Sequence, residues 1–166
     1  MAVKEEYRLK TLFKLRELKK EQAERYLATC LQALRVEQDR QREMEEELER
    51  MIARREAKKR EYAEKAMSGK MDARSAVAAN LYIERLREQE QVQEDAIEGQ
   101  KGVVAEKKQD VQGARADLVN ATQELKALEK HREKWQEEVK RVRQSKEEET
   151  LDEVAQSGFL GRDRDK

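Results

Sequence analysis

The chain contains one histidine and one cysteine, the side chains that most often serve as catalytic or metal-binding groups near neutral pH. His131 stands next to Arg132 in a charged stretch, without a Cys, Asp or Glu cluster at metal-ligand spacing, so we expect it to be a solvated helix residue rather than a ligand or a base. Cys30 falls on an apolar position of a helical pattern. It is expected to be a small apolar filler, with a redox role as the less favoured alternative.

Other patterns that could support chemistry or binding are weak. The sequence GQKG at 99–102 matches the GXXG loop of KH domains, but its surroundings are helical and acidic and lack flanking strands. The chain has 37 basic and 37 acidic residues, whereas general nucleic-acid binding depends on an excess of Lys and Arg. The first twenty residues do carry seven basic and three acidic groups, which predicts either a solvated helix end or docking on an acidic protein surface. Because the chain as a whole has no excess of basic residues, we expect no nucleic-acid partner.

The composition is typical of long helices. Charged residues make up 45% of the 166 residues, proline is absent, and glycine occurs six times. Only 37% of the residues are apolar, which is too few to enclose a site that excludes water. We therefore expect no enzyme, no cofactor and no metal. No apolar run resembles a signal peptide or reaches the ~20 residues of a membrane span. These features predict an all-α, cytoplasmic protein without direct membrane insertion.

Apolar residues repeat with a heptad spacing along the first half of the chain. From Leu9 to Tyr62, steps of four and three residues select mostly apolar positions, interrupted by polar ones at 16–20, 37–41 and 55–58. Such a seam is what two long helices bury against each other.

The pattern stops at SGKMDARS, residues 68–75. Gly69 can end a helix in a left-handed conformation, and Asp72 can cap the next one. A second seam then runs from Ile83 to Val142, and nine of its ten positions from Val111 onward are apolar. The sequence therefore predicts a long antiparallel two-helix coiled-coil hairpin over residues 1–157, with helix one at about 4–67, a turn at 68–72, helix two at about 73–156 and a flexible tail at 158–166.

A turn near residue 70 also predicts the register. Residues that face each other should have numbers adding up to roughly 140, so Trp135 should pack near Val3, Tyr7 and Leu9. Trp135 is the only tryptophan, and we expect it to be structural, holding the two helix ends together. Because each helix satisfies the other's seam, the protein should be a monomer in dilute solution.

Two apolar segments are not explained by the seam. AVAANLYIERL, residues 76–86, follows the turn, and TLDEVAQSGF, residues 150–159, lies where the first helix has already ended. The first segment either covers the end of the hairpin or docks on a partner. Apolar side chains on an unpaired helix end indicate a missing partner.

Four segments resemble the FliJ/YscO family, the stalk proteins of flagellar and virulence-type (type III) secretion systems. They are YRLKTLFKLRELKKEQAER at 7–25, YIERL at 82–86, HREKWQEEV at 131–139 and LDEVAQSGF at 151–159. The last two carry most of the weight, because coiled coils share their composition.

The resemblance implies an antiparallel hairpin similar to the central stalk subunit of rotary ATP synthases. Its terminal end would enter the hexameric export ATPase, and its turn would reach the cytoplasmic domain of the export gate, which places it peripherally at the base of the apparatus on the inner membrane. Some members also bind export chaperones. Carried over by position, the ATPase-end residues would be Tyr7, Arg8, Lys10, Lys14, Leu151, Glu153 and Val154, and the gate-end residues Met71, Arg74, Asn80, Leu81, Tyr82 and Arg85.

Two other functions fit the same pattern. A generic cytosolic coiled-coil adaptor would use the same seam, and so would a prefoldin-like hairpin that holds unfolded chains. Neither predicts an effect on an ATPase. Between the two kinds of secretion system, the tail favours the virulence type.

Overall fold

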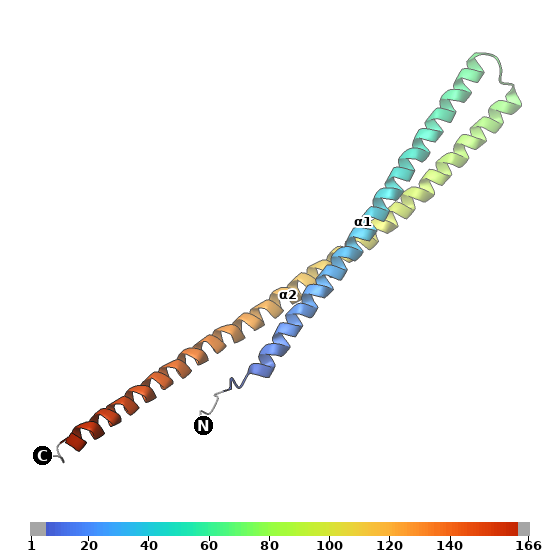
Figure 1. Cartoon of the computed structure of the whole chain (residues 1–166). Coiled ribbons are helices and arrows are strands. Elements are labelled where there is room, and N and C mark those ends of the chain that lie inside the picture. The colour runs from blue at the N-terminus through green and yellow to red at the C-terminus, as the bar shows by residue number, and fades with distance from the viewer. Residues whose placement is uncertain (1–5, 163–166) are drawn as a thin grey trace. The chain divides into compact units, whose positions relative to one another are not determined.

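The computed structural model describes residues 6–162, which form two long helices joined by a short turn (Figure 1). Helix α1 spans Lys10–Met67 and helix α2 spans Ala73–Arg162. The described part of the chain contains no strand. The predicted all-α helical hairpin is confirmed.

The turn ends α1 with a hydrogen-bonding pattern that needs glycine. Gly69 has a φ of 71°, the left-handed conformation that lacks a Cβ penalty in glycine. The amide of Lys70 donates to the carbonyl of Lys65 at 3.1 Å, and the amide of Gly69 donates to that of Ala66 at 3.3 Å. These two bonds make a Schellman motif, which satisfies carbonyls at the helix end. The sequence placed this turn correctly.

The outer bounds of the helices differ from the prediction. Residues 6–9 precede α1, with a turn at 8–9, and the amide of Lys10 donates to the carbonyl of Tyr7 at 3.1 Å. The first helix therefore begins at Lys10, later than expected. At the other end, α2 continues through Gly158 and Gly161 to Arg162, so 158–162 are helical rather than a tail. Each glycine lowers the helix propensity of this segment, but neither ends the helix.

Contacts divide the chain into two units. The terminal unit comprises residues 1–24 and 117–166, and the turn unit comprises residues 25–116. Within each unit, α1 and α2 pack along the predicted seam. Every predicted seam position from 9 to 62 and from 83 to 139 is buried or half-buried, whereas Val142 is 47% exposed. The seam thus ends at Val139.

The turn unit is built on small and medium apolar side chains. Cys30 is buried against Val111 and Ala114, with Leu27 and Leu34 packed alongside. A residue of this size fits where two helices approach closely, and a free thiol behaves there as an apolar group. The buried position is the one that the seam predicted for Cys30.

The polar interruptions of the two seams pair with each other across the helices. In the turn unit, Arg55 Nε donates to Glu90 Oε1 at 2.8 Å, and Gln100 Nε2 donates to Glu37 Oε2 at 2.6 Å. The hydrogen bond to Glu90 raises the pKa of Arg55 above its ordinary value. A shift of the helices by one heptad would leave these buried groups unpaired, so the pairs specify the register.

Candidate functional site

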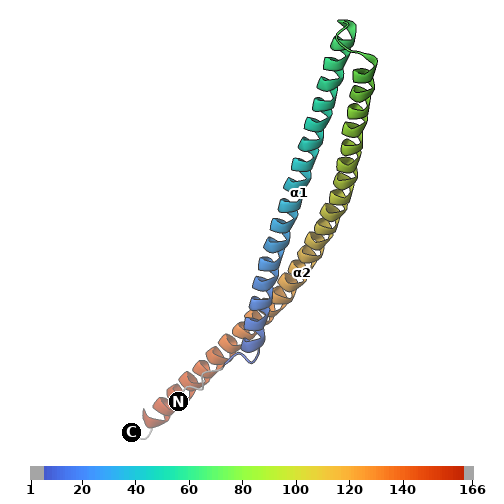
Figure 2. The same cartoon turned by 90° about the vertical axis from the view of Figure 1, so that its right-hand side faces the viewer.

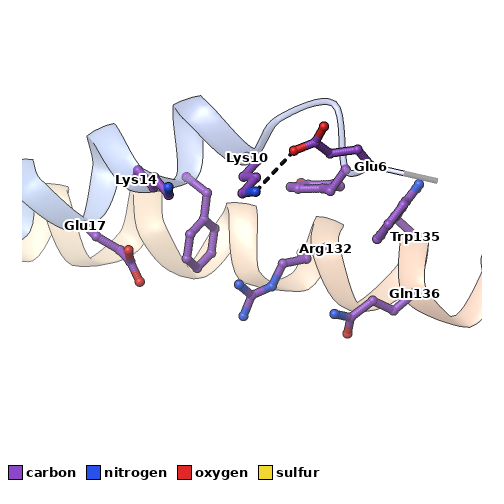
Figure 3. A pocket seen from close by; sticks show the side chains of 9 residues that line it. Glu6, Lys10, Lys14, Glu17, Arg132, Trp135 and Gln136 are labelled. Carbon is purple, nitrogen blue, oxygen red and sulfur yellow. Dashed lines mark hydrogen bonds and ion pairs between the residues drawn. The ribbon is translucent and has the colours of Figure 1, made fainter. Parts of the chain in front are cut away.

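A groove runs along the start of α1 in the terminal unit, where the helix lies against α2 (Figure 3). Its volume is about 630 Å³. Aromatic rings and the stems of charged side chains line it. The lining residues are Glu6, Tyr7, Lys10, Phe13, Lys14, Glu17, Arg132, Trp135 and Gln136.

An aromatic cluster forms part of the wall of this groove. The rings of Tyr7 and Trp135 are tilted at 51° with centroids 5.2 Å apart, and the hydroxyl of Tyr7 lies 2.8 Å from Nδ1 of His131. Tyr7 is only 9% exposed. Tyr7 and Leu9 were predicted opposite Trp135, and the contact with Tyr7 is observed; Val3 lies outside the described residues. The cluster fixes the segment before α1 onto α2.

Sequence reasoning did not assign a partner to His131. It lies next to the seam, and its ring nitrogen contacts the hydroxyl of Tyr7, which belongs to the non-helical segment before α1. The only available signal was that Tyr7 and His131 satisfy the predicted register.

Cations surround the aromatic rings of the groove. The guanidinium carbon of Arg132 lies 4.2 Å from the centroid of the Phe13 ring, a cation–π contact. Lys10 Nζ is 3.1 Å from Glu6 Oε1, and Lys14 also lines the groove (Figure 3). Nε of Arg132 is buried and has no hydrogen-bond partner among the described residues. This arrangement suits an apolar or acidic side chain of a protein partner.

Next to the groove, α1 and α2 are joined by a charged network. Glu124 accepts hydrogen bonds from Arg16 and, at 3.0 Å, from Lys19. The Lys19 ammonium and the Arg16 guanidinium lower the pKa of this carboxyl.

Beyond Val139, α2 has no helix packed against it within the terminal unit. We call residues 140–161 the overhang; every one of them is exposed. In both Figure 1 and Figure 2, α2 extends past the start of α1 in this unit. Its large apolar side chains are Val142, Leu151, Val154, Phe159 and Leu160, which are 47%, 68%, 67%, 77% and 71% exposed.

The predicted ATPase-end residues therefore fall into three groups. Tyr7, Lys10 and Lys14 line the groove, although Tyr7 is buried and its ring is occupied by Trp135. Arg8 is exposed outside the groove. The overhang holds the other three, which are Leu151, Glu153 and Val154.

The predicted gate-end residues all lie in the turn unit. Met71 and Asn80 line a hollow of about 480 Å³ together with Tyr62. Tyr82 is half-buried, and its ring meets that of Tyr62 edge-on at 6.4 Å, so it also supports the helix pair. The remaining three, Arg74, Leu81 and Arg85, are exposed.

A further apolar residue belongs with this exposed set. Val77 is 60% exposed and lies one helical turn before Leu81, which is 57% exposed. The helix period places Arg74 and Arg85 on the same side of α2. We call Arg74, Val77, Leu81 and Arg85 the turn-end face. The i, i+4 spacing of Val77 and Leu81 was the signal that could have included Val77.

Asp72 caps α2 at the start of this face. Its Oδ1 accepts a hydrogen bond from the backbone amide of Ser75 at 2.8 Å. The interaction with the Ser75 side chain, followed by that with its backbone, lowers the pKa of Asp72. The predicted cap is present.

A carboxyl with a depressed pKa in the folded state stabilises the fold above its unfolded pKa and loses this contribution as the pH falls through the folded pKa. We therefore expect Asp72 to titrate below the ordinary value of about 3.9. The first turn of α2 should fray at acidic pH, below that value. Nuclear magnetic resonance titration of the Asp72 carboxyl checks this, and Asp72→Asn, which keeps an acceptor oxygen, should remove the pH dependence. An Asp72 pKa at or above the ordinary value would contradict the capping role.

Residues 6–162 were compared with the side-chain clusters that hold metals and with the helices that span membranes. Within this range, no group of three or more His, Cys, Asp and Glu side chains could hold a metal ion. No helix in the same range is long and apolar enough to cross a membrane.

Comparison with known proteins decides the family. The family model described as YscO-like protein matches residues 4–165, nearly the whole chain. The chain belongs to the YscO-like family. This membership makes it a protein associated with type III secretion.

The fold is also similar to that of a solved relative. A protein from Chlamydia trachomatis, CT670, whose structure is described as that of a YscO homolog, superposes with a TM-score of 0.82. The two chains are 21% identical, and the alignment covers 96% of this chain and 98% of the other. At this identity the likeness concerns the fold. A search of curated proteins finds no match.

Proposed function

We propose that this YscO-like protein is a central stalk component of the type III export apparatus. In this role it couples the hexameric export ATPase to the cytoplasmic domain of the export gate. It would act in the cytoplasm, peripherally at the base of the apparatus on the inner membrane, and it would also receive export chaperones. Family membership supports this assignment.

The observation that carries the proposal is the overhang. Leu151, Val154 and Phe159 are 68%, 67% and 77% exposed on a helix whose paired part has ended. Exposed apolar side chains grouped on an otherwise charged helix mark a protein interaction site. The ATPase is the partner proposed for this site, together with the basic start of α1.

The turn-end face supports the second partner. Val77 and Leu81 form a small apolar patch between Arg74 and Arg85, and more than half of each of the two side chains is exposed. An apolar centre with an Arg rim has the composition of a protein–protein interface. The gate domain is the partner proposed for this face.

The test is a reconstitution with the cognate ATPase. The intact protein should bind the ATPase in a pull-down and raise its ATP turnover by promoting or organising the hexamer. A matched helical hairpin without the overhang serves as the control, because it shows whether adding any helical protein changes ATP turnover. If the intact protein neither binds nor stimulates the ATPase, the stalk role is wrong and a generic coiled-coil adaptor takes its place.

A further inference from the structure

The terminal unit carries an apolar face on α1 that does not belong to the seam. Leu12, Leu15 and Leu18 follow one another at three-residue spacing and are 37%, 58% and 50% exposed. They line a shallow hollow of about 310 Å³ together with Arg16, Lys19 and Gln22. We call Leu12, Leu15 and Leu18 the leucine face. Neither the seam nor the groove accounts for its exposure.

The overhang carries a matching apolar face. Leu151, Val154, Ala155 and Phe159 follow the i, i+3, i+4, i+8 spacing of one side of a helix. Gly158 lies within the same side and has no atom near the position of an added Cβ, so another helix can approach closely there. The overhang is thus an amphipathic helix without a helix to pair with.

The chain segments that carry the two faces have opposite charge. Residues 8–20 contain six basic side chains and one acidic one, whereas residues 147–153 contain five acidic side chains and no basic one. Among residues 6–162, none of these five acids forms an ion pair, and neither do Arg8 and Lys14. These five acids, Arg8 and Lys14 therefore lack a counter-charge, whereas Arg16 and Lys19 beside the leucine face are paired with Glu124.

We propose that two copies of this chain pair through their terminal units, with the overhang of each copy lying on the leucine face of the other. A two-fold axis makes each copy supply both surfaces, so that every contact forms twice. The same symmetry makes the partner's overhang run parallel to α1, so the three-residue step from Leu12 to Leu15 matches that from Leu151 to Val154. At 1.5 Å per residue the overhang spans about 33 Å, which is more than enough to cover the roughly 9 Å from Leu12 to Leu18.

A second copy fits these surfaces because one chain supplies both complementary halves. The prediction of a monomer in dilute solution rests on the seam between α1 and α2. The leucine face and the overhang are not part of this seam. Small apolar patches and screened surface charges produce weak association, so the pairs form at raised concentration and low salt. If the proposed function holds, pairing covers Leu151 and Val154 and competes with ATPase binding, which would keep unassembled copies away from the ATPase.

Sedimentation equilibrium of the intact chain tests the pairing without the ATPase, so its outcome is independent of the stalk role. Over roughly 1 to 200 µM at low salt, the average mass should rise from 19.6 kDa toward twice that value. Reversing charge in the segment that carries the leucine face (Arg8→Glu with Lys14→Glu) or in the overhang (Glu148→Lys with Asp152→Lys) should keep each variant monomeric. Leu81→Ser, in the turn unit, is the matched control and should pair like the unmodified chain.

Mixing the two charge-reversed variants gives the decisive result. Each contact then joins opposite charges again, so the mixture should recover the doubled mass that neither variant reaches alone. A mass of 19.6 kDa over the whole range, or a mixture that stays monomeric, would overturn the proposal. Pairing of either variant alone to the extent of the unmodified chain would overturn it too.

Discussion

Deletion of residues 144–166 is expected to abolish stimulation of the export ATPase. The deletion removes Leu151, Val154 and Phe159, the apolar side chains proposed to contact the ATPase. It leaves the paired helices intact, because the seam ends at Val139. ATP turnover in the presence of the shortened chain should fall to that of the ATPase alone. Circular dichroism should show a loss of helix no larger than the deleted segment.

The matched control alters the other candidate surface. Val77→Ser with Leu81→Ser changes two exposed side chains of the turn-end face and none of the terminal unit. It should leave ATPase stimulation unchanged and weaken pull-down of the gate's cytoplasmic domain. If the deletion spared stimulation while the turn variant destroyed it, the assignment of the two partners would be reversed.

Trp135→Ala is expected to open the terminal unit locally. Truncating a well-buried Trp typically costs about 3–5 kcal/mol, and a half-exposed one in a thin seam should cost roughly half as much, about 2 kcal/mol. The ring packs on Tyr7, which in turn bonds His131, so all three lose their packing. Hydrogen exchange should accelerate at residues 7–16 and 128–139.

The turn unit provides the internal reference for this experiment. Amides around Cys30 and Val111 should keep their protection, because these residues pack in a cluster that does not include Trp135 and proteins open locally, with a different free energy in each region. Trp135→Phe, which keeps a ring against Tyr7, should restore most of the protection. Unchanged exchange at residues 7–16 in Trp135→Ala would mean that the tryptophan does not hold the helix ends together.

The heptad pattern carried most of the information about the fold. A seam position is buried only if the opposite helix has an apolar or paired residue at the same level, so periodicity predicts both the partner face and the register. The pairing of Arg16 with Glu124 follows the predicted register, and so does that of Tyr7 with His131. The turn was equally readable, because few residues other than glycine adopt the conformation of Gly69.

Contacts made by long side chains could not be predicted from the heptad pattern. The polar seam residues Arg55 and Glu90 looked like interruptions, yet their long side chains meet across the helices. Helix ends also escaped, since α1 begins late where Tyr7 turns onto α2 and α2 continues through Gly158. The start of α1 coincides with the packing of Tyr7 on Trp135, a tertiary contact that local propensity does not record.

The candidate site was predictable only in part. Exposed apolar residues beyond the seam, such as Leu151 and Leu81, could be named from the register alone. Tyr7 could not be separated from them, because its burial depends on a non-helical segment lying on Trp135. Leu15 and Leu18 were overlooked because a leucine off the seam carries no periodic signal of its own.

Site-specific photo-crosslinking tests the stalk role most directly. A photoreactive residue placed at Leu151 reports on the overhang, and one at Leu81 reports on the turn-end face; both positions are exposed and neither supports the seam. In a mixture containing the ATPase and the gate domain, the probe at Leu151 should crosslink to the ATPase and the probe at Leu81 to the gate. Crosslinks to the gate from Leu151, or no crosslink to the ATPase from Leu151, would contradict the account.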